Sequence, residues 1–441
     1  MNATPRGSTG PTTTAADENG GASIDLDFPI DPVPPSHRRS FFSIAVVLLG
    51  FTIFVPTMMA GAAIGPSFSF PNFLVVLVLG SAVLGGYVAA IGWLGAKTGL
   101  TSVVMNRYAF GTGGAKLASL LLGGTQVGWF GVVVGSIGEL TAQAFGWSGW
   151  GPRAIVMVIV AALMIVTAAY GYEGMYWVSL ISTPLILILA FWVCFRAVDH
   201  AGGISGLWNV QPATAMGLGA AITTIVGTFA SAGTQAANWT RFARSGSQAA
   251  IAAIIGFAIG NGLMIFFGAI GAISYQQADF IVLLLDMGLI FWALFLLFGN
   301  YWKSNADAAY AFGVAGAEMF NKASKLPYIV GGGIIGTVLA LTGVHQHIIS
   351  YLVLLGVFIP PVGGVLLGDH LARWTVGRPA PRDFVGPVVR WQGMVAYGVA
   401  ALVAYISNER GWGVPPVQGI LIALVLAYIL GRQESTVVTV R

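Results

Sequence analysis

Long apolar runs separated by short polar stretches fill most of this chain. A helix needs roughly 20 apolar residues to cross the hydrocarbon core of a bilayer. The pattern therefore predicts an all-α membrane protein with about twelve transmembrane helices. The run 279–317 is longer than one span and is expected to include a short amphipathic helix before the membrane. The predicted segments are 41–64, 72–94, 115–146, 153–171, 174–197, 217–238, 248–273, 279–317, 327–344, 347–368, 388–407 and 416–431.

Composition supports this interpretation. Of 441 residues, 56% are hydrophobic and 8% are charged, whereas a soluble protein carries roughly 25% charged residues. So few charged residues cannot cover the surface of a soluble fold. We therefore expect the outer surface of the protein to contact the lipid bilayer. The formal charge of +4 does not indicate nucleic-acid binding, because the basic residues are scattered through loops. The single cysteine, Cys194, excludes an intrachain disulfide.

The distribution of Lys and Arg predicts the topology, because these residues are enriched in cytoplasmic loops. Residues 1–38 are polar and are expected to form a disordered cytoplasmic tail. With both termini cytoplasmic, the outer side of the cytoplasmic membrane receives Arg153, Arg196 and Arg410. The inner side receives Arg38, Arg39, Lys97, Arg107, Lys116, Arg241, Arg244, Lys322, Lys325, Arg373, Arg378, Arg382, Arg390, Arg432 and Arg441.

The first and sixth segments contain helix breakers. Non-helical backbone at membrane depth is tolerated where it lines a cavity or is buried in protein. Breaks at these two positions predict two inverted five-helix repeats, with a binding site between them. The core would span 39–368, as repeats 39–197 and 217–368, followed by two C-terminal helices at 369–432 and a cytoplasmic tail at 433–441. The breakers are Pro56, Gly61 and Gly65 in the first segment, and Gly227, Ser231 and Gly233 in the sixth.

Two strings carry side chains suited to a flat, polar-edged ligand. In GGTQVGWFG, Gln126 and Trp129 lie three apart and so share a helix face. An amide can read a base edge, and an indole offers a face for stacking. In GTFASAGTQAANWTRF (227–242), Phe229 would supply a second stacking face, and Thr228 or nearby backbone would supply hydrogen bonds. The alternative interpretation is helix packing through glycines, with ordinary core aromatics.

A third string, GNYWKSNADAAYA, places Asn300, Lys303, Ser304 and Asp307 inside the eighth segment. A charged side chain within a span costs roughly 2.5–3.5 kcal/mol and usually faces a cavity or a partner. Lys303 and Asp307 are four apart, so they are a candidate ion pair. The alternative is that this pair is purely structural.

Neither a Walker motif, a nucleophile elbow nor an HExxH motif occurs in the sequence. We therefore expect a secondary transporter without catalytic residues. Two other classes remain open. A channel would require filter or voltage-sensing repeats, and a membrane-embedded enzyme would have to work through Lys303 and Asp307.

The same three strings resemble the bacterial cytosine permeases of the nucleobase–cation symporter family. The likeness extends from about Arg39 to the C-terminal helix. It implies a LeuT-like fold with a 5+5 inverted repeat, two further C-terminal helices, and a ligand between segments 1, 3, 6 and 8. The most specific stretches are GAKTGL (95–100), LLLGGTQVGWFG (120–131), SAGT (231–234) and IPPVGGV (359–365).

The resemblance also implies roles for the candidate residues. Gln126 would hydrogen-bond the base, while Trp129 and Phe229 would sandwich its ring. Thr228 stands where these permeases have Ser, and its backbone would contact the base. Asn300 would supply a polar contact from segment 8.

The family's cation site is matched incompletely. Backbone carbonyls equivalent to those of Gly50 and Phe54 hold sodium in the family, together with two hydroxyls of segment 8. Here the first hydroxyl position is Lys303, and only Ser304 is retained. We therefore expect the coupling ion to be either Na⁺ or H⁺, with Lys303 favouring the proton.

The expected function is import of a nucleobase, with cytosine as the leading substrate, by alternating access in a monomer. Another small heterocycle, such as a purine, a hydroxymethylpyrimidine or an allantoin-like compound, is the alternative substrate. No cofactor is expected beyond the coupling ion.

Overall fold

The computed structural model describes residues 31–170, 173–277, 279–320, 324–375 and 386–438, together with the single residues 28, 322, 379, 381 and 384. These residues form helices and one isolated bridge between Arg39 and Ala243. The all-α prediction is therefore confirmed. Most of the predicted tail 1–38, and residues 439–441, lie outside the described residues.

Each predicted apolar segment coincides with helix. Seven segments are single helices in the described residues, and each of the others contains two or more helical pieces. The single helices are α3 (Phe70–Thr98), α4 (Ser102–Ala144), α5 (Trp150–Tyr170), α6 (Glu173–His200), α15 (Leu326–Leu341), α18 (Trp391–Arg410) and α19 (Pro415–Val438). The paired pieces are α1 (Phe41–Thr52) with α2 (Met58–Ile64), α8 (Leu218–Thr234) with α9 (Ala237–Thr240), α10 (Gly246–Ala253) with α11 (Asn261–Tyr275), α13 (Ile290–Leu296) with α14 (Trp302–Met319), and α16 (Ile348–Phe358) with α17 (Pro360–Arg373).

Length and apolarity identify six described helical runs that can span a membrane, or eight if each bent pair forms one span. One bent pair is the first segment, whose halves meet at 61°. The other joins the end of α6 to α7 (Gly203–Asn209) at 72°. These findings agree with the predicted multi-pass architecture.

Two predicted boundaries and the character of one short helix differ from the structure. α4 begins at Ser102, but it is kinked at Gly111, whose φ of 81° and ψ of 170° are not helical. The predicted start near residue 115 lies just after this kink, and the turns before it carry polar residues that hide them from a hydropathy pattern. α19 continues to Val438, beyond the predicted end near 432. The long run 279–317 contains a separate short helix, α12 (Phe280–Asp286), as predicted. The helix is not amphipathic, however, because all residues from Phe280 to Leu284 are buried.

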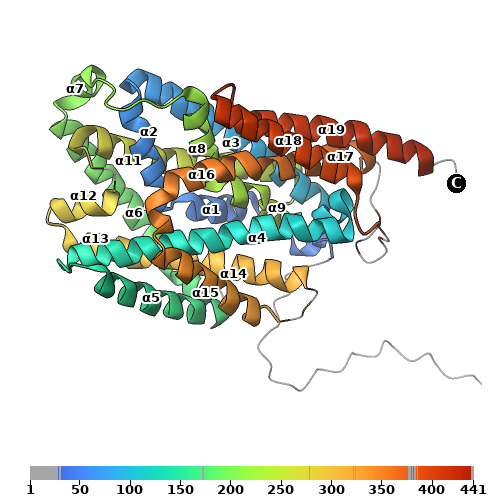
Figure 1. Cartoon of the computed structure of the whole chain (residues 1–441), viewed down its shortest axis with the longest axis horizontal. Coiled ribbons are helices and arrows are strands. Elements are labelled where there is room, and N and C mark those ends of the chain that lie inside the picture. Colours follow the sequence, from blue (N-terminus) through green and yellow to red (C-terminus); the bar gives the residue numbers. More distant parts are fainter. Residues whose placement is uncertain are drawn as a thin grey trace, which may run out of the picture.

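The broken first segment lies in the middle of the bundle (Figure 1). Its α2 half packs closely on α11 through glycines. A Cβ atom at Gly268 would lie 2.0 Å from the Met58 carbonyl oxygen, and one at Gly61 would lie 1.9 Å from the Ile265 carbonyl oxygen. Such contact between backbones explains why small residues recur where these helices cross.

One end of the bundle gathers arginines on backbone carbonyls, and we call it the basic end. Arg38 donates to the carbonyls of Ala96 and Ala243, at 2.6 and 2.8 Å, which join the ends of α3 and α9. Arg390 is 2% exposed and binds Asp369 and the carbonyl of Ala109. The C terminus of α19 lies at this end (Figure 1). At the opposite end, Arg153 pairs with Glu139 at 3.1 Å.

The contact between α2 and α11 generates a stability prediction. Gly268→Ala places a methyl group against the Met58 backbone, which cannot move aside as a flexible side chain would. Overpacking of this kind costs about 1–3 kcal/mol, so the unfolding temperature of the protein in detergent should fall. Gly331→Ala is the control, because its added Cβ meets no atom within 4 Å. Equal unfolding temperatures for the two variants would contradict the packing described here.

Candidate functional site

Segment 1 leaves helical geometry between α1 and α2. Ile53 and Phe54 have ψ angles of 80° and 112°, and a short 3₁₀ turn from Val55 to Thr57 follows. Pro56 lacks an N–H donor and favours the interruption. The break exposes backbone donors and acceptors that must find partners, because the surrounding core is apolar.

Asn300 satisfies the break. Its side-chain Nδ2 donates to the Ile53 carbonyl oxygen, and its Oδ1 accepts from the Val55 backbone N–H, both at 2.9 Å. Asn300 is 2% exposed and lies in a π-helical turn from Leu297 to Tyr301, between α13 and α14. The amide predicted to contact the substrate therefore holds the two halves of segment 1 together in this conformation. Its contact with substrate stays a prediction.

Segment 6 breaks at Phe229, whose φ of −132° and ψ of 21° interrupt α8. The preceding Thr228 donates its hydroxyl to the Ile225 carbonyl oxygen at 2.7 Å. The same hydroxyl accepts from Asn261 Nδ2 at 2.9 Å. Asn261 Oδ1 is buried and has no hydrogen-bond partner among the described residues. The predicted break is thus present, with the Phe229 ring at the point of distortion.

A hydrogen-bond cluster joins α4 to α8 beside this break. Gln126 Nε2 donates to Ser231 Oγ at 3.2 Å, and the hydroxyls of Thr125 and Ser231 lie 2.6 Å apart. Gln235 Nε2 also donates to Ser231 Oγ, at 3.3 Å. Gln126 is 9% exposed, so its side chain faces the protein interior and not lipid. Its Oε1 is the atom that this cluster leaves to accept a hydrogen bond from a ligand.

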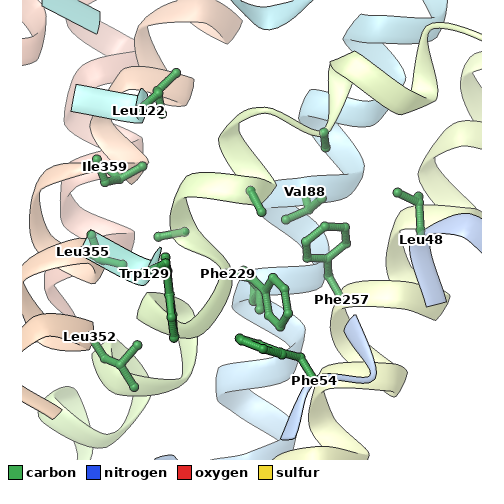
Figure 2. Packing of buried hydrophobic residues seen from close by; sticks show 14 of the residues in the cluster. Leu48, Phe54, Val88, Leu122, Trp129, Phe229, Phe257, Leu352, Leu355 and Ile359 are labelled. Atoms are coloured by element: carbon green, nitrogen blue, oxygen red, sulfur yellow. The ribbon is translucent and has the colours of Figure 1, made fainter. Parts of the chain in front are cut away.

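Trp129 and Phe229 point into the same aromatic core, together with Phe54 (Figure 2). The ring centroids of Trp129 and Phe54 are 5.7 Å apart, and those of Phe229 and Phe51 are 5.6 Å apart, both edge to face. Trp129 and Phe229 are 8% and 5% exposed. The predicted pair therefore converges on the break of segment 1, where each ring contacts a different phenylalanine of that segment.

The predicted cation site is placed in part. The Phe54 carbonyl oxygen accepts from both the N–H and the hydroxyl of Thr57, at 3.1 and 2.8 Å. Both of its lone pairs are therefore used in this conformation. Gly50 lies on the last turns of α1, and Ser304 is half-buried on α14.

Lys303 lies on α14, but its side chain is outside the part of the chain that the structure describes. Asp307 is half-buried one helical turn further along. The suggested ion pair between them stays a prediction. Groups of three or more His, Cys, Asp or Glu side chains able to hold a metal ion are absent from the described residues.

Comparison with known proteins decides the family. Residues 32–378 match the family described as permeases for cytosine/purines, uracil, thiamine and allantoin. The cytosine permease of Escherichia coli (strain K12) is 35% identical over 424 residues, covering 95% of this chain and 98% of that one. The chain belongs to this permease family.

Solved structures give the same fold. The transporter Mhp1 of the nucleobase-cation-symport-1 family superimposes in its inward-facing conformation with a TM-score of 0.78, at 17% identity, covering 96% of this chain and 95% of that chain. Its closed conformation with bromovinylhydantoin bound gives a TM-score of 0.75, at 17% identity and with 93% and 96% coverage. The predicted LeuT-like fold is thereby confirmed, and a family of permeases makes this chain a multi-pass membrane transporter and not an enzyme.

Several residues around the site of this permease were not predicted from the sequence. Phe51 carried a signal, because it is an aromatic residue five positions before Pro56, the helix breaker of the first segment. Asn261 also carried one, as a lone amide in an apolar run. Ser231 was noted as a helix breaker but not as the centre of the hydrogen-bond cluster. Tyr351 had no signal, since a tyrosine in an apolar segment is ordinary.

The role of Asn300 in holding the break can be measured as stability. Asn300→Ala leaves the Ile53 carbonyl and the Val55 N–H buried without their partner. Leaving a buried group unsatisfied costs about 1–3 kcal/mol, so the unfolding temperature should drop clearly. Asn305→Ala is the control, because Asn305 is equally buried on the same segment but donates a longer bond, 3.4 Å, to the Phe130 carbonyl. A larger loss in the Asn305 variant would contradict the assignment.

Proposed function

We propose that this permease imports a nucleobase, with cytosine as its leading substrate, by binding it between the breaks of segments 1 and 6. The observation that carries the proposal is the convergence of Gln126, Trp129 and Phe229 on one buried core beside both breaks. Flat rings stack on aromatic faces, and an amide oxygen can accept from an exocyclic amine. The printed name of the Escherichia coli relative, a cytosine permease, agrees with this chemistry.

Alternating access supplies the transport mechanism in this proposal. A cavity of about 280 Å³ at the basic end runs along α4, with Lys116 exposed and Ser119 buried. Ser119 lies one helical turn before Leu122, whose carbonyl accepts from Ser231 of the hydrogen-bond cluster. The lining of the cavity thus ends one helical turn along α4 from the hydrogen-bond cluster, and we propose that substrate leaves the site on this side. We assign the basic end to the cytoplasm, because Lys and Arg concentrate on that side of bacterial membranes.

Coupling is proposed to use a proton. The Phe54 carbonyl, one of the two backbone ligands expected for sodium, already accepts two hydrogen bonds from Thr57. Lys303 replaces one of the two hydroxyls that would complete the ion's shell. An ammonium at that position competes with sodium for the same carbonyls, and a lysine can lose and regain its proton when buried.

The aromatic pair generates a binding prediction. Trp129→Ala and Phe229→Ala should each weaken cytosine binding by about 1–3 kcal/mol, the scale of base–aromatic stacking, and so by roughly 5- to 150-fold in Kd. Equilibrium binding of radiolabelled cytosine to purified protein measures this. Phe145→Ala is the control, because Phe145 is exposed beyond the end of α4. Unchanged affinity in both site variants would remove the basis of the proposed site. Competition by purines and allantoin tests the substrate class.

The coupling proposal predicts that uptake into vesicles proceeds in sodium-free buffer and is driven by an inward proton gradient. Lys303→Thr restores the second hydroxyl and should introduce a measurable dependence on sodium. Lys97→Thr, at the basic end of α3, is the control for loss of a positive charge. A steep sodium requirement in the unsubstituted protein would contradict proton coupling while leaving the substrate site intact.

A further inference from the structure

Tyr351 reaches from α16 to the turn of α4 that carries the proposed recognition residues. Its hydroxyl donates a 2.5 Å hydrogen bond to the backbone carbonyl of Thr125, the residue before Gln126. Its ring also meets the Trp129 indole edge to face, with centroids 5.7 Å apart. A single side chain therefore contacts the α4 backbone at Thr125 and, one turn later, the indole of Trp129.

Gly128 makes this contact sterically allowed. A Cβ atom at Gly128 would lie 2.4 Å from the Tyr351 hydroxyl oxygen and 2.8 Å from the ring carbon that bears it. One turn earlier on the same helix, a Cβ atom at Gly124 would meet no atom within 4 Å. Gly128 thus leaves the space that the Tyr351 hydroxyl occupies, whereas a larger residue at Gly124 would meet no neighbouring atom.

The next residue of α16 contacts the other recognition helix. The backbone carbonyl oxygen of Leu352 lies 1.9 Å from where a Cβ atom of Gly227 would stand. Gly227 immediately precedes Thr228 and Phe229 at the break of α8. Leu352, Trp129 and Phe229 belong to the same cluster of buried hydrophobic residues (Figure 2). Two consecutive residues of α16 therefore meet α4 beside Trp129 and α8 beside Phe229.

We infer that Tyr351 is a positioning residue for substrate recognition: through its hydroxyl it fixes the turn carrying Gln126 and Trp129 relative to the break at Phe229. The inference rests on the proposed function, because it concerns how the aromatic pair of that site is held. In this inference, the hydrogen bond from the Tyr351 hydroxyl to the Thr125 carbonyl sets the orientation of the α4 turn that carries Trp129. The close approach of the Leu352 backbone to Gly227 holds α8 against the same stretch of α16. Loss of the hydroxyl leaves the ring in the core but frees the turn to rotate.

Tyr351→Phe tests this inference, because it removes the hydroxyl and keeps the ring. One intramolecular hydrogen bond lost from a preorganised site should raise the Kd for radiolabelled cytosine about 3- to 10-fold. In uptake assays KM should rise by a similar factor, with the maximal rate changed less than about twofold. Gly128→Ala displaces the hydroxyl from the other side and should act in the same direction. Gly124→Ala is the matched control and should bind like the unsubstituted protein.

A double substitution separates positioning from general packing. If Tyr351 acts through Trp129, Tyr351→Phe should add little to the loss caused by Trp129→Phe, since coupled residues are non-additive. Additive effects, or a lowered unfolding temperature with unchanged Kd, would overturn the inference and leave Tyr351 a structural residue.

Failure of the inference is distinguishable from failure of the proposed function. If Trp129→Ala weakens cytosine binding and Tyr351→Phe does not, the inference alone is wrong. If the unsubstituted protein binds no cytosine, or Trp129→Ala binds it as tightly as the unsubstituted protein, the proposed site is wrong and the inference falls with it.

Discussion

The site depends on a side chain that replaces lost helix hydrogen bonds in the middle of the bundle. Segment 1 abandons helical geometry at Ile53 and Phe54, and water cannot satisfy the backbone groups released inside an apolar core. The Asn300 amide supplies one donor and one acceptor to that backbone. Because Asn300 belongs to a π-helical turn of another segment, the break in segment 1 and the distortion in segment 8 stabilise one another.

This constraint also organises the aromatic core. The break directs Phe54 toward Trp129 on α4, while Phe51, on the last turn of α1, contacts Phe229 on α8. The rings of Trp129 and Phe229 are therefore packed against the non-helical break of segment 1. In the proposed site, a ligand between these rings would meet segment 1 where the backbone is held by side chains and not by a continuous helix. The proposal therefore links substrate binding to segment 1.

Much of this architecture could be predicted from the sequence. Apolar runs gave the helices because a bilayer imposes a length and a hydropathy that few other environments require. Pro56, Gly227 and Gly233 located the two breaks. The pattern failed at the start of α4, where Asn106, Arg107 and other polar residues lie on helix at the basic end.

The contacts within the site were less accessible to sequence reasoning. Gln126, Trp129 and Phe229 were found because their chemistry suits a flat heterocycle and their strings resemble a known family. Asn300 forms its hydrogen bonds with Ile53 and Val55, which lie 247 and 245 positions earlier in the sequence. Local pattern carries no information about such a pairing. The hydrogen bond from the Tyr351 hydroxyl to the α4 backbone was not predicted, for the same reason.

The central claim is that a nucleobase binds where the breaks of segments 1 and 6 meet. An experimental structure of the purified protein with cytosine bound tests it most directly. We expect ligand density in contact with Trp129 and Phe229, with a polar edge toward Gln126. Density elsewhere, such as in the cavity beside Arg107 and Lys116, with the aromatic core closed, would contradict the account.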